Sequence, residues 1–311
     1  MTGYEALRHD AAIVDLSHRG KIRVEGEDRA RLLHAMSTNH VQNLLEGHGL
    51  YTFFLNEKGR ILADAYIYCL GSDMLIDTEP ETAKSLYEHL DRYIIADDVT
   101  LTDETERWAA IGLEGPRATD IARNLGYSVP QGIAGVAKSE TGFLTAVTAS
   151  GADGVRFFVP TEEKTALIDR LKSQGAVPAG EEELRIVRLE NGRARFGEDI
   201  SERYLVQETR IENAVHSNKG CYLGQEIVER VRSRGQVHRL LTPIRVAGKV
   251  VLPAGTKLNV NGKDVAEVTA TVFSPDLNEV IGLAYVRAEV VEGRETMAVT
   301  GTELPVAVYL R

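Results

Sequence analysis

The sequence has little cysteine and lacks any long apolar run. Its 311 residues include two cysteines, Cys69 and Cys221. A disulfide framework is therefore not expected, and one chain cannot supply the four thiolates of a stable metal site or cluster. No stretch approaches the roughly 18 apolar residues of a membrane-spanning helix, and Glu5, Arg8 and Asp10 occupy positions where a signal peptide is apolar. We expect a cytoplasmic protein with reduced thiols and no membrane contact.

The sequence also has fewer basic than acidic residues. Lys and Arg number 36 against 46 Asp and Glu, a formal net charge of −10. General nucleic-acid binding is not expected, because it depends on neutralising phosphates. The chain has no phosphate-binding loop, dinucleotide fingerprint, zinc-protease motif or serine-hydrolase elbow. Its eight histidines show no metal-ligand spacing, so no metal site is predicted.

What the chain does contain predicts an α+β fold. Its length suits two or three domains. Strand and helix patterns indicate two α/β modules with antiparallel sheets, over approximately 1–105 and 106–238. Residues 239–311 lack a convincing helix and carry the hairpin signal Asn261-Gly262, which predicts a small β-barrel or sandwich.

Local signals place several turns and helix ends. Residues 50–70 predict a hairpin that turns at 56–59. Thr78 and Thr161 are expected to cap the helices that follow them. Glycines are expected just beyond three helix C-termini, at Gly126, Gly175 and Gly192.

The segment 219–226, KGCYLGQE, carries the strongest chemical signal. Cys221 is expected just ahead of a helix that runs from Gly224 through Arg234, with Lys219 beside it. The helix dipole and the cation would both favour the thiolate, which can ligate iron or exchange with another thiol. The alternative is a small buried apolar residue, and local chemistry alone leaves both interpretations open. Cys69 lies in an alternating strand and is expected to be structural.

This octapeptide resembles the signature of the YgfZ-type folate-binding proteins, which are relatives of the glycine-cleavage T-protein. Further segments that resemble the family follow in order along the chain, at 12–18, 36–39, 59–62, 113–117, 188–192, 196–199, 272–275 and 281–286. The resemblance implies a GcvT-like fold of two α/β modules plus a C-terminal β-barrel around a central folate channel. It also implies a tetrahydrofolate cofactor.

The resemblance assigns two carboxylates. Glu190 is expected to anchor the pterin, because a carboxylate can accept two adjacent N–H groups of that ring; the alternative is a surface Glu paired with an Arg. Asp64 stands where T-proteins have a paired-Asp segment that supplies the catalytic acid, and this chain has one acid there. The sequence leaves open whether Asp64 matches the catalytic acid, its neighbour, or a solvent-facing residue at a strand edge.

Other expected site residues lie near the signature. Tyr222 either stacks on an aromatic ligand or fills a hinge between modules. Arg230 belongs to a basic segment, 230–239, which either binds the acidic tail of folate or forms a solvated helix face with a Glu226–Arg230 pair. A nucleic-acid patch is a third interpretation, which the acidic composition disfavours. Gly220, Gly224, Gln225 and Glu226 are expected to shape the loop around Cys221.

Three functions are compatible with these expectations. The first is a tetrahydrofolate-binding accessory protein for assembly or repair of iron–sulfur clusters, with client enzymes or assembly proteins as partners and Cys221 as the reactive thiol. The second is an aminomethyltransferase that moves a one-carbon unit to tetrahydrofolate and needs a lipoyl-protein partner. The third is a non-catalytic interaction module with a degenerate folate pocket. Whether the protein is an enzyme is left open.

Overall fold

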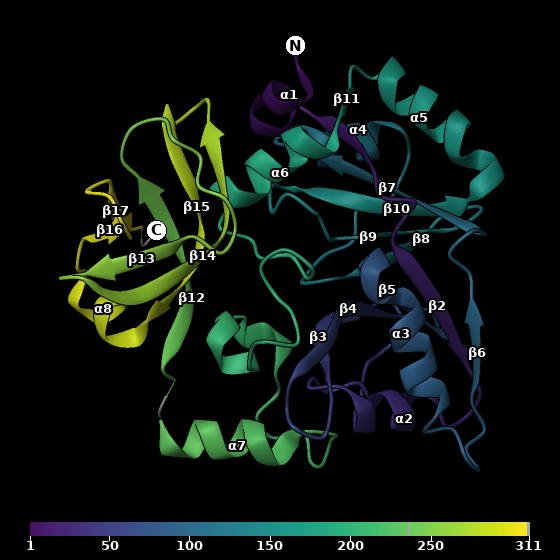
Figure 1. Ribbon diagram of the computed structural model, residues 1–311. Coiled ribbons are helices and arrows are strands. Elements are labelled where there is room, and N and C mark those ends of the chain that lie inside the picture. The colour runs from purple at the N-terminus through teal and green to yellow at the C-terminus, as the bar shows by residue number, and fades with distance from the viewer. Residues whose placement is uncertain (236, 310–311) are drawn as a thin grey trace.

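Two stacked sheets lie beside a barrel in the computed structural model, which describes residues 1–235 and 237–309 (Figure 1). The first sheet has the strand order β3-β4-β5-β2-β6 with antiparallel pairing throughout. Its strands are β2 (Gly20–Glu25), β3 (Gly49–Leu55), β4 (Ile61–Cys69), β5 (Met74–Thr78) and β6 (Thr100–Asp103).

Helices α2 (Arg29–Met36) and α3 (Pro80–Asp91) cover one face of the first sheet. Alternate residues of β4, among them Ala63, Ala65 and Ile67, point into the apolar core that these helices close. The intervening residues of β4 point to the opposite face, which is where the second sheet lies.

The second sheet has the order β11-β1-β7-β10-β9-β8, antiparallel except for the β1–β11 pair. Its strands are β1 (Ala12–Asp15), β7 (Trp108–Glu114), β8 (Val136–Lys138), β9 (Phe143–Thr145), β10 (Gly154–Pro160) and β11 (Val177–Ala179). Helices α4 (Ala118–Asn124) and α5 (Lys164–Ser173) pack on its outer face. Strand β1 therefore lies in the second sheet, although it precedes every strand of the first.

The two sheets meet through an aromatic core and a buried ion cluster. Tyr68 of the first sheet contacts Phe143 and Phe158 of the second, with ring centroids 6.1 and 5.7 Å apart. Asp77 of β5 is fully buried and pairs with Arg19, whose Nε lies 2.6 Å from Oδ1, and with Arg156 of β10. This carboxylate joins the first sheet to the second across their interface.

The C-terminal part is a closed six-stranded barrel in the order β12-β15-β14-β13-β16-β17. Its strands are β12 (Arg239–Val246), β13 (Lys257–Val260), β14 (Lys263–Ser274), β15 (Glu279–Arg287), β16 (Met297–Val299) and β17 (Pro305–Val308). The short helix α8 (Ala288–Gly293) lies between β15 and β16. The expectation of no helix in this part was wrong. This six-residue helix contributes Val290 and Val291 to the barrel core.

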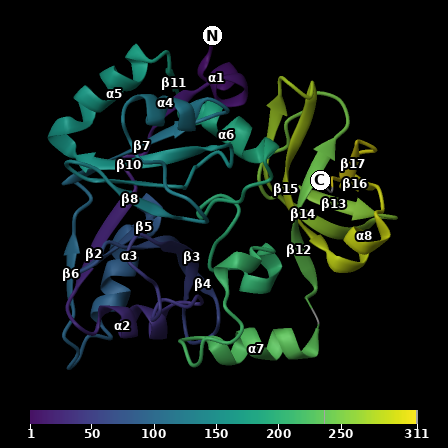
Figure 2. The ribbon, with the colours of Figure 1, turned by 180° about the vertical axis from the view of Figure 1, so that it is seen from behind.

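Five helical segments connect these parts. Helix α1 (Gly3–His9) packs on α6 (Glu181–Glu190), and α6 also contacts the barrel strands β14 and β15. The 3-10 turns η2 (Val206–Thr209) and η3 (Glu212–Ala214) follow, and then α7 (Gln225–Arg234) leads to the barrel. Figures 1 and 2 show from opposite sides that α7 lies at the foot of the molecule, apart from α6.

The expected α+β fold, with antiparallel sheets and a barrel, is confirmed. The predicted helix ends at Gly126, Gly175 and Gly192 are also confirmed, since each has a positive φ just beyond its helix. The predicted caps were wrong. Thr78 ends β5 and donates its hydroxyl to the Asp64 carbonyl at 2.6 Å, and Thr161 begins the 3-10 turn η1 (Thr161–Glu163) without capping α5. The approximate module boundaries stay a prediction.

The ion cluster between the sheets predicts a large effect of one substitution. Asp77→Asn leaves Arg19 and Arg156 buried without their shared carboxylate, so we expect a loss of about 3–5 kcal/mol in the free energy of unfolding, measured by urea denaturation. Burial alone would raise the pKa of Asp77, but Arg19 and Arg156 outweigh it and lower that pKa. The contribution of this carboxylate is therefore present above its unfolded pKa and is lost as pH falls through the folded value.

The matched control is Asp120→Asn, which removes an exposed carboxylate paired with Arg123 within one helix. An exposed pair of this kind contributes little to stability. Equal losses in the two variants would show that Asp77 does not hold the sheets together.

Candidate functional site

A cavity of about 930 Å³ lies where the two sheets, α6 and the barrel meet. This volume lies within the roughly 300–1,000 Å³ of small-molecule sites. The first sheet contributes Tyr51, Asp64 and Tyr66, and the barrel contributes Leu241 and Leu283. Seven arginines line the cavity, namely Arg19, Arg156, Arg185, Arg188, Arg193, Arg195 and Arg210.

Asp64 faces this cavity because of the alternation along β4. Ala63 and Ala65 point into the helix-covered core, whereas Asp64 and Tyr66 point to the cavity side. An acid at position 63 would lie in the apolar core. The acid that this chain retains is thus the one on the cavity side of the strand, and Asp64 is buried there and not solvent-facing.

The surroundings of Asp64 raise the pKa of its carboxyl group. The Tyr51 hydroxyl donates to Asp64 Oδ2 at 2.5 Å. Burial, followed by the negative charge of Glu79, raises the pKa of Asp64 to about 6, against the opposing influence of the Tyr51 hydrogen bond and of Arg19 and Arg195. A carboxyl group with this pKa can exchange a proton near neutral pH.

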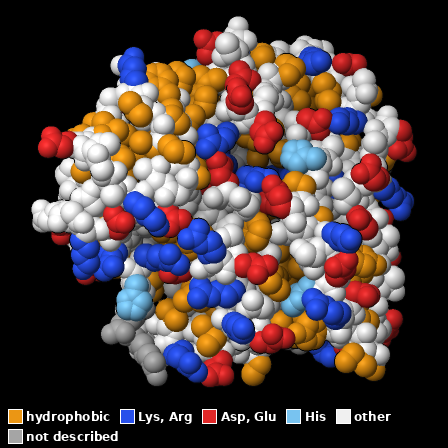
Figure 3. All heavy atoms as spheres, viewed as in Figure 1, with side chains coloured by type: hydrophobic (Ala, Val, Ile, Leu, Met, Phe, Trp, Pro, Cys, Tyr) orange, Lys and Arg blue, Asp and Glu red, His pale blue; other side chains and the backbone are white. Residues whose placement is uncertain are grey.

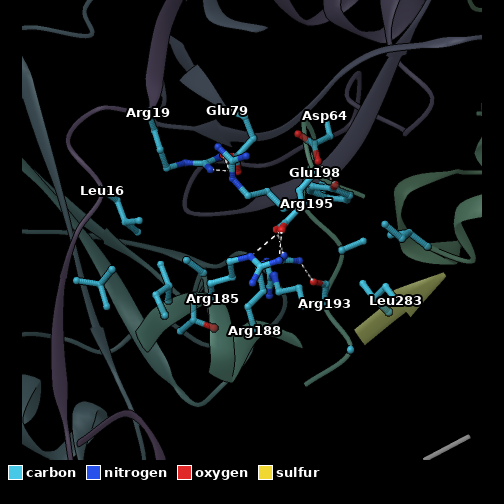
Figure 4. Close-up of a pocket in the computed structure, with 18 of the residues that line it drawn as sticks. Leu16, Arg19, Asp64, Glu79, Arg185, Arg188, Arg193, Arg195, Glu198 and Leu283 are labelled. Atoms are coloured by element: carbon cyan, nitrogen blue, oxygen red, sulfur yellow. Dashed lines mark hydrogen bonds and ion pairs between the residues drawn. The ribbon is translucent and has the colours of Figure 1, made fainter. Parts of the chain in front are cut away.

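Most cavity arginines are held by carboxylates, as Figure 4 shows. Arg19 and Arg195 both pair with Glu79, the latter through Nε at 3.0 Å from Oε2. Arg185 and Arg188 both pair with Glu198. Sequence reasoning missed this network because Glu79 lies far along the chain from Arg19 and Arg195; the dense Arg pattern at 185–195 was the available signal.

Glu190 does not belong to the residues that line the cavity. It lies at the end of α6, where its Oε1 accepts hydrogen bonds from the Tyr4 hydroxyl at 2.7 Å and the Ser274 hydroxyl at 2.6 Å. Its Oε2 lies 3.4 Å from Nε of Arg8. These contacts join α1 and α6 to the barrel and give Glu190 a structural role, while its role as pterin anchor stays a prediction.

Arg230 and Tyr222 also lie outside the cavity lining. Arg230 is exposed on α7 and pairs with Glu226 at 2.5 Å, the geometry of a solvated helix face. In the rest of the basic segment Arg232 pairs with Glu229 and Arg239 with Glu208; the Arg234 side chain and Gln236 lie outside the described residues. Figure 3 likewise shows basic and acidic side chains intermixed on one face of the molecule. Tyr222 is buried against Val228 in an apolar cluster, where it packs between elements.

The loop of the KGCYLGQE signature is docked on the C-terminus of α2. The buried Lys219 ammonium donates to the carbonyls of His34 and Ser37, and the His34 ring donates through Nε2 to the Lys219 carbonyl at 2.7 Å. The Leu223 amide donates to the Ala35 carbonyl at 2.9 Å. A cation and an amide thus satisfy carbonyls that a helix end leaves free.

The Lys219 side chain is held at the end of α2. Its ammonium points to the carbonyls of α2 and lies 4.8 Å from the centroid of the Tyr222 ring. Burial lowers the pKa of Lys219 to about 7. The structure gives this lysine the role of fixing the loop, and its predicted role in activating the thiol stays a prediction.

The other signature residues shape the same loop. Gly220 and Gly224 have φ of +92° and +81°, and a Cβ on Gly224 would lie 2.7 Å from the Asn56 carbonyl oxygen. The Gln225 side chain accepts from the Tyr222 amide at 3.2 Å. Glu226 is exposed and pairs with Arg230. Gly224 thus allows the loop to approach the turn of the β3–β4 hairpin closely.

Cys221 is the exposed thiol of this loop, whereas Cys69 is buried in β4. Cys221 lies three residues before Gly224, the N-cap of α7, so it precedes the first turn, where the dipole acts most strongly. Neither Cys221 nor Glu190 lines the cavity. The structure brings Asp64 into the cavity and places the thiol loop elsewhere.

No helix in the described ranges 1–235 and 237–309 has the length and apolar character needed to cross a membrane. Within the same ranges, no three His, Cys, Asp or Glu side chains are arranged to hold a metal ion.

Fold and cavity together define a three-part α+β protein with an internal cavity walled by two sheets and a barrel. Residues 2–219 match the GCVT N-terminal domain family, and residues 238–311 match the glycine cleavage T-protein C-terminal barrel domain. The chain belongs to this family. The finer assignment to its YgfZ-type branch stays a prediction.

Known proteins similar to this chain agree with the family. An aminomethyltransferase of Rubrobacter xylanophilus is 31% identical over 94% of this chain and 81% of the relative. An aminomethyltransferase of Herpetosiphon aurantiacus is 27% identical over 92% of this chain and 81% of the relative. The crystal structure of the glycine cleavage system aminomethyltransferase T from Bartonella henselae has a TM-score of 0.89, with 20% identity and coverage of 99% of this chain and 87% of that one. The structural likeness confirms the fold.

The docking of the signature loop predicts local opening when Lys219 is changed. Lys219→Met removes the donor to two helix-end carbonyls, so we expect the free energy of local opening to fall by about 1.5–3 kcal/mol. Faster hydrogen exchange of the Leu223 amide is the measurement. Lys84→Met, at a lysine exposed on α3, is the control and leaves that exchange unchanged. Unchanged exchange in Lys219→Met would rule out the proposed fixing role.

Proposed function

We propose that this protein is a cytoplasmic, tetrahydrofolate-binding accessory protein that serves iron–sulfur enzymes through the thiol of Cys221. The observation that carries the proposal is the construction of the signature loop. Lys219 holds the loop against α2, Gly224 lets it approach the β3–β4 turn, and Gln225 bonds the Tyr222 amide within the loop, while Cys221 is left exposed. A loop built to present one thiol suits contact with a partner or client enzyme.

The chemistry assigned to Cys221 is ligation. After loss of its proton, the thiolate donates an electron pair to an iron atom of a cluster that the partner also ligates. This chain has two cysteines, of which one is buried, so the remaining ligands of such a cluster must come from elsewhere. The cluster is a substrate in this proposal, and its ligation by Cys221 is transient.

The side chains that line the cavity offer the kinds of contact that a folate would make. The Tyr51 and Tyr66 rings, with centroids 5.0 Å apart, offer apolar and aromatic surface. Asp64 offers a carboxyl group for ring N–H groups, and the cavity arginines offer charge for the carboxylates of the glutamate tail. In the proposal these residues hold tetrahydrofolate, which supplies a one-carbon carrier when bound.

Cysteine replacement separates the two parts of this proposal. Cys221→Ala is expected to keep its tetrahydrofolate affinity, because Cys221 does not line the cavity, and to lose complementation of an iron–sulfur enzyme defect in cells. Calorimetry and growth are the measurements. Cys69→Ala, at the buried cysteine, is the matched control and retains both properties. Full complementation by Cys221→Ala contradicts the thiol role, and absence of heat with tetrahydrofolate contradicts the folate role.

A second candidate, aminomethyl transfer to tetrahydrofolate, is favoured by Asp64. This acid faces the cavity, and the pKa of Asp64 is raised to about 6. The names of the aminomethyltransferase relatives point the same way.

The second candidate predicts a defined pH profile. Turnover with an aminomethyl-lipoyl carrier protein is expected to fall below pH about 6 as Asp64 takes up a proton and to be lost in Asp64→Asn. Asp15→Asn, at a cavity acid paired with Lys164, is the control and keeps the profile. Robust turnover with this behaviour would replace the accessory function, whereas tetrahydrofolate binding without turnover supports it.

A further inference from the structure

The guanidinium of Arg193 differs from five other guanidinium groups of the cavity. Each of those has at least one carboxylate partner in the structure: Arg19 with Asp77 and Glu79, Arg156 with Asp77, Arg185 with Glu198, Arg188 with Glu198 and Asp199, and Arg195 with Glu79 and Glu81. Among residues 1–235 and 237–309, no carboxylate oxygen lies within 4.0 Å of the Arg193 guanidinium.

Arg193 instead donates to a neutral group, the hydroxyl of Tyr66. Glu114 lies in its vicinity, but both carboxylate oxygens of Glu114 already accept hydrogen bonds, from the Ala149 amide at 2.7 Å and from the Ser150 amide and hydroxyl at 2.8 and 2.5 Å. The backbone of Arg193 is held at the end of α6, because its amide donates to the Arg188 carbonyl at 3.0 Å. Its position on the cavity wall is visible in Figure 4.

A half-buried guanidinium with one neutral partner retains unused donors. The group has five N–H donors in a planar fork that matches a carboxylate. Attraction between opposite charges is stronger in a cavity than in water, because the surroundings are less polar. The neighbouring arginines pair with carboxylates of the protein itself. For Arg193, an anionic group that enters the cavity would be the corresponding partner.

We propose that Arg193, together with Tyr66, receives a carboxylate group of the cavity ligand and selects carboxylated ligands over uncharged ones. This role adds a ligand contact to the proposed function, and the choice of ligands to test rests on that function. The carboxylate comes either from the glutamate portion of a folate or from a separate small amino acid bound beside the pterin. Arg193 lies on the same wall as Asp64, since Tyr66 and Tyr51 lie between them with adjacent rings.

The test compares ligands with and without the carboxylate in the intact protein. Calorimetry is done with tetrahydrofolate, with 6-methyltetrahydropterin, which lacks a carboxylate, with p-aminobenzoylglutamate, which lacks the pterin, and with glycine in the presence of the pterin. For Arg193→Gln we expect roughly a ten- to hundredfold loss of affinity for the carboxylated ligand and no change for the pterin. Arg193→Lys keeps the charge without the fork and is expected to recover part of the affinity.

Arg170→Gln is the matched control. Arg170 is exposed on α5, does not line the cavity and donates to the Tyr127 hydroxyl at 3.0 Å. Its replacement therefore removes the same charge and the same kind of tyrosine contact away from the cavity. We expect it to leave the affinities for all four ligands close to wild type. A thermal unfolding midpoint for each variant separates loss of binding from loss of folding.

Each outcome either identifies the carboxylate that Arg193 binds or overturns the proposal. A loss with tetrahydrofolate and p-aminobenzoylglutamate assigns the glutamate carboxylate, and a loss confined to glycine assigns the small amino acid. An equal loss with 6-methyltetrahydropterin and tetrahydrofolate, or no loss with any ligand, overturns the role of Arg193. If wild-type protein binds neither pterin, the proposed function fails, while loss of p-aminobenzoylglutamate binding in Arg193→Gln would still support the carboxylate site.

Discussion

The buried carboxylate of Asp77 is the interaction on which the arrangement of the two sheets depends. It lies on β5, fully excluded from solvent, and is shared by Arg19, which precedes β2 of the first sheet, and Arg156 of the second sheet. Removing one partner of such a cluster leaves a buried charge uncompensated, so its members constrain one another strongly. The aromatic contacts of Tyr68 with Phe143 and Phe158 lie in the same interface between the sheets.

The same charges extend from the sheet interface to the cavity. Arg19 pairs with Glu79 as well as with Asp77, and Glu79 pairs in turn with Arg195 on the cavity wall. The negative charge of Glu79 helps to raise the pKa of Asp64 to about 6, after the larger effect of burial. The structural cluster and the candidate catalytic acid therefore belong to one electrostatic system, and the protonation of Asp64 depends on contacts that also hold the sheets together.

Local signals predicted much of the fold and part of the site. Glycines 126, 175 and 192 marked helix ends because the left-handed backbone there favours glycine, and the alternation of β4 explains why Asp64 reaches the cavity. The pairing of β1 with β7 and the ion pairs of Arg156 with Asp77 and of Arg195 with Glu79 were not predictable in this way, since they join segments far apart in the chain. Thr78 was expected to cap the helix that follows it, but its hydroxyl donates to the Asp64 carbonyl on the neighbouring strand β4.

One hairpin supports both candidate sites although they share no residue. Strands β3 and β4 contribute Tyr51, Asp64 and Tyr66 to the cavity. Their turn lies against the signature loop, where a Cβ on Gly224 would come 2.7 Å from the Asn56 carbonyl oxygen and one on Gly59 would come 2.8 Å from Ile227. Close backbone approach leaves little room for independent movement of turn and loop. The position of the Cys221 loop is thus fixed by the same two strands that carry the cavity tyrosines and Asp64, which ties the thiol to the cavity through the backbone.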